Sequence, residues 1–324
     1  MPNHVTNILT IKGAEVQKVL DAIRGKDEHD EKNFIDFNKI IPMPESMNIE
    51  DGSRTDFGIA ILEFRAEGDC EELNKIMQYP WVKNEGITTP KELCEFLLKS
   101  GKADLIEGQK ALNNKKNYGF KTWYDWACAK WGTKWNAYCQ NIELGGSDGI
   151  KRSFARITFD TAWTTPLPIF EKLSTMFPKT TFLVDYADED IGNNCGTLHI
   201  KGGVAKVVYV GTGDMKAMIF ANKVKGRNLA SILEDYINED VIAEDESSFG
   251  NPAFTKELIE HFIETDEQQL KDFIATEQLS EKIFDFIEKV AVKNDAFELA
   301  GIVVKRKKEL SLILSQNKGN SPLL

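Results

Sequence analysis

The sequence lacks the features that mark membrane-spanning, exported and disulfide-rich proteins. Its 324 residues contain no apolar run close to the roughly 18 residues that span a bilayer. The first twenty residues do not have the charged-then-apolar order of a signal peptide, so we expect a cytoplasmic protein with no membrane partner. The five cysteines are scattered and form no CxxC pair, which is typical of free thiols: Cys70, Cys94, Cys128, Cys139 and Cys195.

Motifs for cofactors and catalysis are scarce as well. The four histidines are far apart and have no partner at metal-ligand spacing: His4, His29, His199 and His261. The glycine-containing segment Gly211–Lys216 lacks the third glycine of a dinucleotide fingerprint and the Gly-Lys-Ser/Thr of a P-loop, so a plain turn is expected there. We therefore expect no cofactor, and the sequence leaves enzymatic activity undecided while favouring a protein without it.

Charge is unevenly distributed along the chain. The formal net charge is −11, yet the segment from Glu234 to Glu281 holds fifteen acidic residues against two basic ones. The segment from Lys110 to Arg156 holds nine basic residues against three acidic ones. Such a chain offers two different electrostatic surfaces to partners, so its overall pI of about 5.1 does not exclude nucleic acid.

The order of predicted strands and helices indicates the fold. Alternating apolar residues predict a strand at Val5–Ile11, and helical spacing predicts a helix from Val16 to Ile23. After a long, mostly helical stretch, the next elements are expected at Trp135–Leu144, Ser153–Thr161, Pro166–Phe177 and Thr181–Tyr186, as strand, strand, helix and strand. This order is that of a ferredoxin-like split βαβ sheet with a helical insertion, and we predict an α+β protein.

Two further regions complete the predicted domain organisation. Gly202-Gly203 lies between two more predicted strands and indicates an added hairpin. Beyond Asn222 the apolar residues recur at helical spacing in short segments separated by polar breaks, which is typical of a small helical bundle. We predict a ferredoxin-like domain over residues 1–221 with its insertion at about 42–130, an acidic helical domain over 222–318, and a tail over 319–324.

Several sequence segments together resemble a known family. They are Met1–Asn7, Trp126–Tyr138, Phe159–Pro168 with Phe177-Pro178, and Tyr186–Asp190. In this order they resemble the YubB-type family with a ferredoxin-like domain, which is encoded by plasmids and phages and is largely without assigned activity. The resemblance covers roughly residues 1–45 and 120–205. It implies the fold and a mobile-element origin, and it carries over no catalytic residues.

Four of the six tryptophans fall within thirteen residues: Trp123, Trp126, Trp131 and Trp135. One interpretation is a core that joins the insertion to the sheet. The other is a stacking surface for a nucleotide or RNA base, with nearby Lys121, Lys130 and Lys134 meeting phosphates. The ligand-binding residues predicted on this second interpretation are Trp123, Trp126, Trp131, Lys134, Trp135, Asn136 and Trp163.

Acidic residues cluster where the strand at Thr181–Tyr186 ends. Asp185, Asp188, Glu189 and Asp190 are oxygen ligands of the kind that Mg²⁺ or Ca²⁺ prefers. Their spacing does not match an EF-hand loop, so a solvated acidic turn is the competing interpretation. The four residues are metal-ligand candidates, and a metal-dependent hydrolase is a third class of function.

The acidic segment supports the leading functional hypothesis. Its plain interpretation is a solubilising helix face. Because duplex DNA carries dense, regular negative charge, a rigid acidic surface can also imitate it and occupy the basic groove of a DNA-handling protein. We expect a non-catalytic phage or plasmid protein that binds a host or element-encoded protein in the host cytoplasm, as a counter-defence inhibitor. The predicted interaction surface is Glu239, Asp240, Glu244, Asp245, Glu246, Glu260, Glu264, Asp266 and Glu267.

Overall fold

The structure is a computed structural model, and it describes residues 2–26, 32–145, 153–227, 252–265, 267–276 and 281–319. The chain divides into two compact units, and each is described by itself. The first unit comprises Met1–Glu189 and Thr197–Tyr209. The second comprises Asp190–Gly196 and Val210–Leu324.

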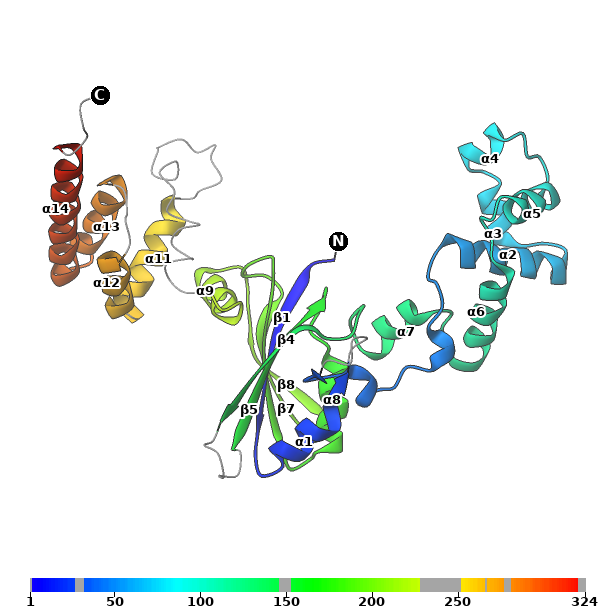
Figure 1. Cartoon of the computed structure of the whole chain (residues 1–324), viewed down its shortest axis with the longest axis horizontal. Helices are drawn as coiled ribbons and strands as arrows, with labels where there is room; N and C mark the ends of the chain where they lie inside the picture. Colours follow the sequence, from blue (N-terminus) through cyan, green and yellow to red (C-terminus); the bar gives the residue numbers. More distant parts are fainter. Residues whose placement is uncertain are drawn as a thin grey trace. The chain divides into compact units, whose positions relative to one another are not determined.

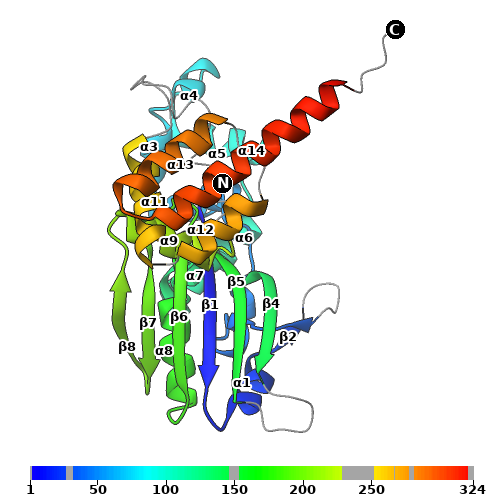
Figure 2. The same ribbon diagram turned by 90° about the vertical axis from the view of Figure 1, so that its left-hand side faces the viewer.

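A six-stranded sheet forms the centre of the first unit (Figure 1). Its strands are β1 (His4–Lys12), β4 (Tyr138–Gly145), β5 (Phe154–Ala162), β6 (Thr181–Asp188), β7 (Cys195–Lys201) and β8 (Val204–Val210). They lie in the order β4-β5-β1-β6-β7-β8, and Figure 2 shows them side by side. β1 pairs antiparallel with both β5 and β6, so that Leu9 lies opposite Ile157 and Val184. The predicted ferredoxin-like α+β sheet with an added hairpin is confirmed. The structure adds that β1 is an inner strand and that the β7–β8 hairpin lies beside β6.

Two helices cover one face of this sheet. α1 (Val16–Ile23) and α8 (Leu167–Met176) lie behind the strands in Figure 2. α1 buries Val19 and Leu20, and α8 buries Phe170, among the sheet residues of one continuous core cluster. Phe159 of β5 is fully buried against this layer. The alternate residues of β1 and β5 point away from the helices, because side chains on a strand alternate between faces.

The first unit also contains a tight hairpin, a separate two-stranded ribbon and a short helix. Gly202 and Gly203 connect β7 to β8 with φ of 58° and 85°, the left-handed conformations that a tight hairpin needs and that glycine adopts without strain. A separate two-stranded ribbon joins β2 (Gly25–Lys26) to β3 (Lys32–Asn33). The short helix η1 (Phe37–Lys39) follows it and buries Phe37 in the sheet core.

The insertion between β3 and β4 forms a helical lobe with a core of its own. The insertion lobe, residues 45–118, contains η2 (Glu45–Met47), α2 (Ser53–Glu67), α3 (Glu71–Ile76), α4 (Pro80–Asn84), α5 (Pro90–Lys99) and α6 (Leu105–Tyr118). Its separate core cluster includes Ile61, Leu73, Leu93 and Leu97. After it comes α7 (Trp123–Lys130), whose Trp126 returns to the core of the sheet.

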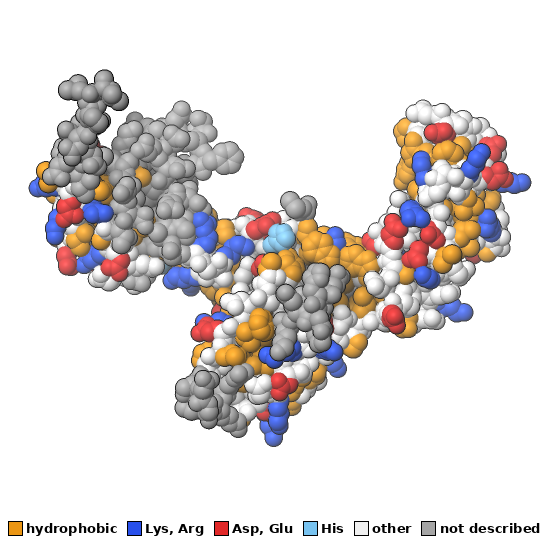
Figure 3. All heavy atoms as spheres, in the orientation of Figure 1, with side chains coloured by type: hydrophobic (Ala, Val, Ile, Leu, Met, Phe, Trp, Pro, Cys, Tyr) orange, Lys and Arg blue, Asp and Glu red, His pale blue; other side chains and the backbone are white. Residues whose placement is uncertain are grey.

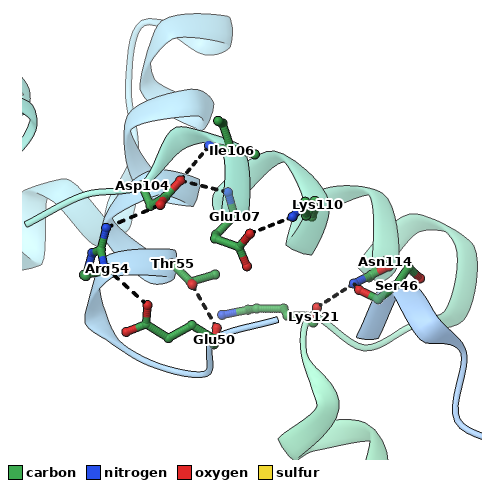
Figure 4. A network of polar contacts seen from close by, with 10 residues as sticks. All are labelled: Ser46, Glu50, Arg54, Thr55, Asp104, Ile106, Glu107, Lys110, Asn114 and Lys121. Atoms are coloured by element: carbon green, nitrogen blue, oxygen red, sulfur yellow. Dashed lines mark hydrogen bonds and ion pairs between the residues drawn. The ribbon is translucent and has the colours of Figure 1, made fainter. Parts of the chain in front are cut away.

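α2 and α6 cross at two glycines. A Cβ added at Gly58 would lie 2.0 Å from the backbone oxygen of Asp104, and one added at Gly108 would lie 2.6 Å from the backbone of Gly58. The two backbones therefore approach as closely as only glycine allows. Figure 4 shows the polar contacts around this crossing: Asp104 accepts hydrogen bonds from the first amides of α6 and lies 3.4 Å from Arg54 of α2.

The second unit is helical. Its described helices are α9 (Met215–Val224), α11 (Pro252–Thr265), α12 (Glu267–Thr276), α13 (Glu281–Lys293) and α14 (Phe297–Gly319). Leu258, Phe273, Phe284 and Leu299 come from four of them and are buried in one cluster. None of the helices in the described parts of the chain combines the length and the apolar character needed to cross a bilayer.

Candidate functional site

Aromatic side chains surround one lysine at the end of the sheet where β1 and β4 begin and β5 ends. We call Tyr124, Lys134, Trp135 and Trp163 the aromatic–basic cluster. Tyr124 comes from α7, Lys134 and Trp135 from the connection between α7 and β4, and Trp163 from the residue after β5. In the space-filling view, hydrophobic side chains gather on the surface between the sheet and α7 (Figure 3).

The amino group of Lys134 lies over three rings. Its Nζ is 4.8 Å from the ring centre of Trp135, 5.3 Å from that of Trp163 and 5.6 Å from that of Tyr124. Tyr124 and Trp163 also contact each other edge to face, with ring centres 6.1 Å apart. Each cation–π contact is worth about 0.5–1 kcal/mol at an exposed site. Together they fix the position of the lysine without using a carboxylate.

The cluster is accessible, and its lysine has no acidic partner among the described residues. Trp135 is 37% exposed and Trp163 is 38% exposed, although indole rings are usually among the more buried side chains. Within the described residues, no carboxylate lies within ion-pairing distance of Lys134. Trp135 also lines an open, shallow hollow with Asn136, Ala137 and Tyr138.

The backbone is strained on both sides of the cluster. Trp163 has a φ of 72°, a left-handed conformation that is unfavourable for a bulky residue. Its amide donates to the carbonyl of Asn3 at 2.8 Å, which holds it there. Cys139 has a φ of 51° and lies in a bulge of β4, where the register to β5 shifts between Tyr138 and Asn141. Bulges and strained residues of this kind are common beside functional sites because they redirect side chains.

Tyr138 and His4 extend the cluster along the end of the sheet. The hydroxyl of Tyr138 lies 2.6 Å from Nδ1 of His4, and the two rings meet edge to face with centres 5.7 Å apart. The ring of Tyr138 also contacts Trp135 at 6.2 Å. Burial, together with the nearby charge of Asp160, raises the pKa of Tyr138 to about 12. The phenol therefore stays protonated at neutral pH.

Two of the predicted ligand-binding tryptophans are in the core instead. Trp126 is 5% exposed and Trp131 is 4% exposed, and their rings meet edge to face at 5.4 Å. The Nε1 of Trp131 donates to the carbonyl of Ile41 at 2.9 Å. For these two rings the structure favours the first interpretation, a core that joins the insertion to the sheet.

Two other members of the predicted set have partly structural contacts. Asn136 accepts a hydrogen bond from the amide of Phe37 and donates to Asp36, so its amide ties η1 to the start of β4. Trp123 is partly buried and contacts Tyr124 at 5.8 Å between ring centres. The predicted residues that the structure brings together on the surface are Lys134, Trp135 and Trp163.

Three members of this region were missing from the predicted set: His4, Tyr124 and Tyr138. Tyr124 is adjacent to Trp123 and could have been included as part of the aromatic run. Tyr138 lies three positions after Trp135, but its contact with His4 depends on the β4-β5-β1 order of the sheet. No local sequence signal identifies the contribution of His4.

The candidate lysines separate as well. Lys121 is ion-paired with Asp56 of α2 at 3.3 Å, in the insertion lobe. The Nζ of Lys130 lies over the ring of Phe120 at 5.5 Å. Lys134 is therefore the one of the three whose amino group contacts the exposed tryptophans.

The candidate metal ligands do not converge. Asp185 lies opposite Ile8 and accepts from the Thr197 hydroxyl at 2.6 Å. Asp188 is buried and accepts from the side-chain amide of Asn3 at 3.1 Å. Because they are three positions apart on one strand, Asp185 and Asp188 point to opposite faces of the sheet.

The other two candidates lie beyond the strand. Glu189 is exposed just after β6, and Asp190 belongs to the second unit. Among the residues that the structure describes, no group of three or more His, Cys, Asp or Glu side chains is arranged to hold a metal.

The predicted acidic surface lies largely outside the described residues. This applies to Glu239, Asp240, Glu244, Asp245, Glu246 and Asp266. Of the remaining three, Glu260 pairs with Lys256 at 3.5 Å and Glu267 pairs with Lys271 at 3.0 Å. Glu264 is exposed on α11.

A family model agrees with the fold of the sheet. Residues 134–228 match a family model described as the ferredoxin-like domain in Api92-like protein, so such a domain is present in this chain. The matched segment begins at Lys134 and includes Trp135 and Trp163. No curated protein matches the chain. Among solved structures, it is similar to the crystal structure of the protein Api92 from Yersinia pseudotuberculosis, with 12% identity, 65% of this chain and 100% of that chain covered, and a TM-score of 0.28.

Proposed function

We propose that this protein is a non-catalytic binding protein that takes up a nucleotide or a single-stranded RNA segment on the aromatic–basic cluster. The observation that carries the proposal is the pair of exposed indoles, Trp135 and Trp163, whose ring centres lie 4.8 Å and 5.3 Å from the amino group of Lys134. That amino group is ion-paired with no carboxylate of the described residues. Proteins that bind single strands combine exposed aromatic rings for the bases with positive charge for the backbone.

Stacking supplies the first part of the interaction. Every base has a π-face, and stacking on an aromatic side chain is worth about 1–3 kcal/mol per base. The strained backbone of Trp163 supports this role, since a left-handed tryptophan persists only where the surrounding structure enforces it. Trp135 offers a second ring beside the open hollow.

Lys134 supplies the second part. A phosphate bound to it gains a charge-assisted hydrogen bond, and no carboxylate among the described side chains competes for the amino group. The rings below keep the amino group close to the stacking surfaces. Base and phosphate of one nucleotide can therefore be held together.

The raised pKa of Tyr138 suits this neighbouring group to hydrogen bonding rather than to proton transfer at neutral pH. An effective general acid or base has a pKa near the working pH. Burial raises the pKa of Tyr138 to about 12, which leaves its hydroxyl a hydrogen-bond donor or acceptor at neutral pH. A hydroxyl at this position is suited to recognising a polar edge of a base or a ribose.

Intrinsic tryptophan fluorescence tests the proposal. Titration with AMP, UMP and a ten-nucleotide single-stranded RNA is expected to quench part of the emission in a saturable way. A Trp135→Ala/Trp163→Ala variant that still folds is expected to lose that quenching. A flat response of the wild-type protein to all three ligands would refute the proposal.

A second candidate function rests on the acidic segment. Fifteen acidic against two basic residues between Glu234 and Glu281 form the most strongly charged segment of the chain. We propose, as the alternative, that a phage- or plasmid-encoded protein uses this charge in the host cytoplasm to imitate DNA and inhibit a host defence protein. Pull-down of a DNA-binding protein in a 1:1 complex that salt and competing duplex DNA both dissociate would support it. Retained capture after Glu239, Asp240, Glu244, Asp245 and Glu246 are all replaced by glutamine would contradict it.

A further inference from the structure

Tyr138 and His4 lie on the face of the sheet opposite α1 and α8. Asp160 of β5 lies opposite both Tyr138 of β4 and Thr6 of β1, so these three residues form one row across the strands. His4 is two residues before Thr6 and therefore points to the same face. Phe159, the neighbour of Asp160, points to the other face and into the core.

The distance between the Tyr138 hydroxyl and His4 indicates which group donates. The phenol oxygen lies 2.6 Å from Nδ1 of His4. Hydrogen bonds donated by an N–H to oxygen are about 2.7–3.2 Å long, whereas those donated by a hydroxyl extend down to about 2.5 Å. The phenol therefore donates its proton to Nδ1, and its oxygen has only acceptor positions left for a ligand.

The groups around this phenol are acceptors as well. The carboxylate of Asp160 accepts from the Thr6 hydroxyl at 2.8 Å, and no lysine or arginine of the described residues pairs with it. Burial raises the pKa of Tyr138, and the nearby charges of Asp160 and Glu189 raise it further. This end of the site is therefore electronegative, whereas the amino group of Lys134 carries positive charge.

Trp135 contacts both the positive and the electronegative end. Its ring centre is 4.8 Å from the amino group of Lys134 and 6.2 Å from the ring centre of Tyr138. A nucleotide whose base stacks on this indole can direct its phosphate to the lysine and an edge of the base to the phenol oxygen. That edge has to donate hydrogen bonds, because two acceptors brought together leave both without a partner.

We infer that the site selects bases that carry an exocyclic amino group, adenine and cytosine, over hypoxanthine and uracil, which have a carbonyl oxygen at the same position. This inference rests on the proposed function and adds the class of base to it. The amino group donates to the phenol oxygen of Tyr138 and is favoured by the carboxylate of Asp160. A carbonyl oxygen at that position gains no hydrogen bond and is repelled by the same groups.

Two pairs of mononucleotides test the selectivity. AMP and IMP differ by an amino group against a carbonyl oxygen, as do CMP and UMP, and the charge and stacking surface are nearly equal within each pair. Fluorescence titration of the wild-type protein is expected to give affinities about three- to tenfold higher for AMP than for IMP, and for CMP than for UMP. A preference for IMP and UMP would show that the hydroxyl donates to the ligand, and would overturn the inference.

Substitutions assign the preference to the phenol. Tyr138→Phe keeps a ring against Trp135 but removes the oxygen, so it is expected to bind the two members of each pair about equally. His4→Phe keeps an aromatic ring at the other side of the hydroxyl and frees its proton for a carbonyl oxygen, so it is expected to reduce the preference. Tyr118→Phe, at an exposed residue of α6, is the matched control and should keep the preference.

The possible outcomes separate this inference from the proposed function. Ten-nucleotide oligo(C) and oligo(U) extend the comparison to ligands that need more than one nucleotide for binding. Saturable quenching with equal affinity within every pair, or a preference that persists in Tyr138→Phe, would overturn the selectivity and leave nucleotide binding intact. A flat response to all the mononucleotides and both oligonucleotides would refute the proposed function, and the selectivity with it.

Discussion

The amino group of Lys134 lies 5.3 Å from the ring centre of Trp163, although the whole of β4 and β5 separates the two residues in the chain. The contact exists because β4 and β5 pair antiparallel, which returns the end of β5 to the start of β4. The binding surface proposed here is therefore a consequence of the ferredoxin-like sheet. Because Trp135 and Trp163 are exposed, variants of this surface can be made without replacing residues of the core.

Removing one stacking ring should weaken binding by a predictable amount. Trp135→Ala and Trp163→Ala are each expected to lower the affinity for a ten-nucleotide single-stranded RNA by about 1–3 kcal/mol, or roughly 5- to 150-fold. Isothermal titration calorimetry measures the change. Trp81→Ala is a matched control, because Trp81 also lies under a lysine, Lys102, at 4.8 Å, but in the insertion lobe. Equal losses in all three variants would argue against a specific site.

Lys134 should account for part of the salt dependence of binding. Each phosphate contact to a single strand contributes a slope of about 0.7 in the plot of log affinity against log salt. Lys134→Gln is expected to reduce the slope by about that amount, because it keeps much of the side-chain length but removes the charge. Lys130→Gln, which removes an exposed lysine over Phe120, should leave the slope unchanged. An unchanged slope for Lys134→Gln would show that this lysine does not contact phosphate.

The fold could be predicted because its signals are local. Alternation in Val5–Ile11 and helical spacing at Val16, Val19 and Leu20 are properties of short segments, and their order along the chain defines a ferredoxin-like sheet. The predicted strand start at Trp135 was too early, since β4 begins at Tyr138. The reason is Asn136, whose side chain forms hydrogen bonds with Asp36 and with the amide of Phe37. These bonds hold residues 135–137 away from β5, so the strand pairing starts later.

The candidate site was predicted less well because its contacts are tertiary. Helical spacing places Trp123 and Trp126 on neighbouring positions of one helix, but it does not tell that Trp126 is enclosed by the sheet core. The pairing of Tyr138 with His4 requires knowledge of which strands are neighbours. The sequence therefore predicts an aromatic, basic region, and the fold determines which of its side chains are exposed to a ligand.

Thiol labelling should report on the site. Cys139 is exposed and directly follows Tyr138, which lines the hollow, whereas Cys70 is buried. Burial also raises the pKa of the Cys94, Cys128 and Cys195 thiols. Since the thiolate is the reactive form, one thiol per chain is expected to react quickly at about pH 8. Saturating nucleotide should slow that reaction, and Cys139→Ser should abolish the fast phase. A fast phase that nucleotide does not affect would place the ligand elsewhere.

The raised pKa of Tyr138 predicts that the free energy of unfolding falls at alkaline pH. The pKa of Tyr138 is about 12 in the folded protein, against about 10 for an ordinary tyrosine. Between these values the unfolded chain releases the proton and the folded chain keeps it, so this contribution to stability is present below pH 10 and is lost as the pH rises toward 12.

Urea unfolding at several pH values tests this dependence. Tyr138→Phe is expected to show a smaller decline in the free energy of unfolding between about pH 9 and pH 11 than the wild type. Tyr118→Phe, a change at an exposed residue of α6, should follow the wild-type curve. Parallel curves for all three proteins would contradict the raised pKa.

The crossing of α2 and α6 should tolerate no side chain. Gly58→Ala places a Cβ 2.0 Å from the backbone oxygen of Asp104, which forces the helices apart, and we expect the free energy of unfolding of the insertion lobe to fall by about 1–3 kcal/mol. Hydrogen exchange in α2 and α6 measures the loss. Gly301→Ala on α14 is the control: its Cβ meets no described atom within 4 Å, so a gain of about 0.5–1 kcal/mol in the stability of α14 is expected. Unchanged exchange in Gly58→Ala would show that the two helices are not in close contact.

The position of the bound ligand is the most direct test of the account. A short single-stranded RNA that carries thiouridine can be cross-linked to the protein by light, and the attached peptide can be identified by mass spectrometry. Cross-links to peptides that contain Trp135 or Trp163, and their loss in the double alanine variant, are the predicted result. Cross-links confined to other segments, or none under conditions in which the RNA is bound, would contradict it.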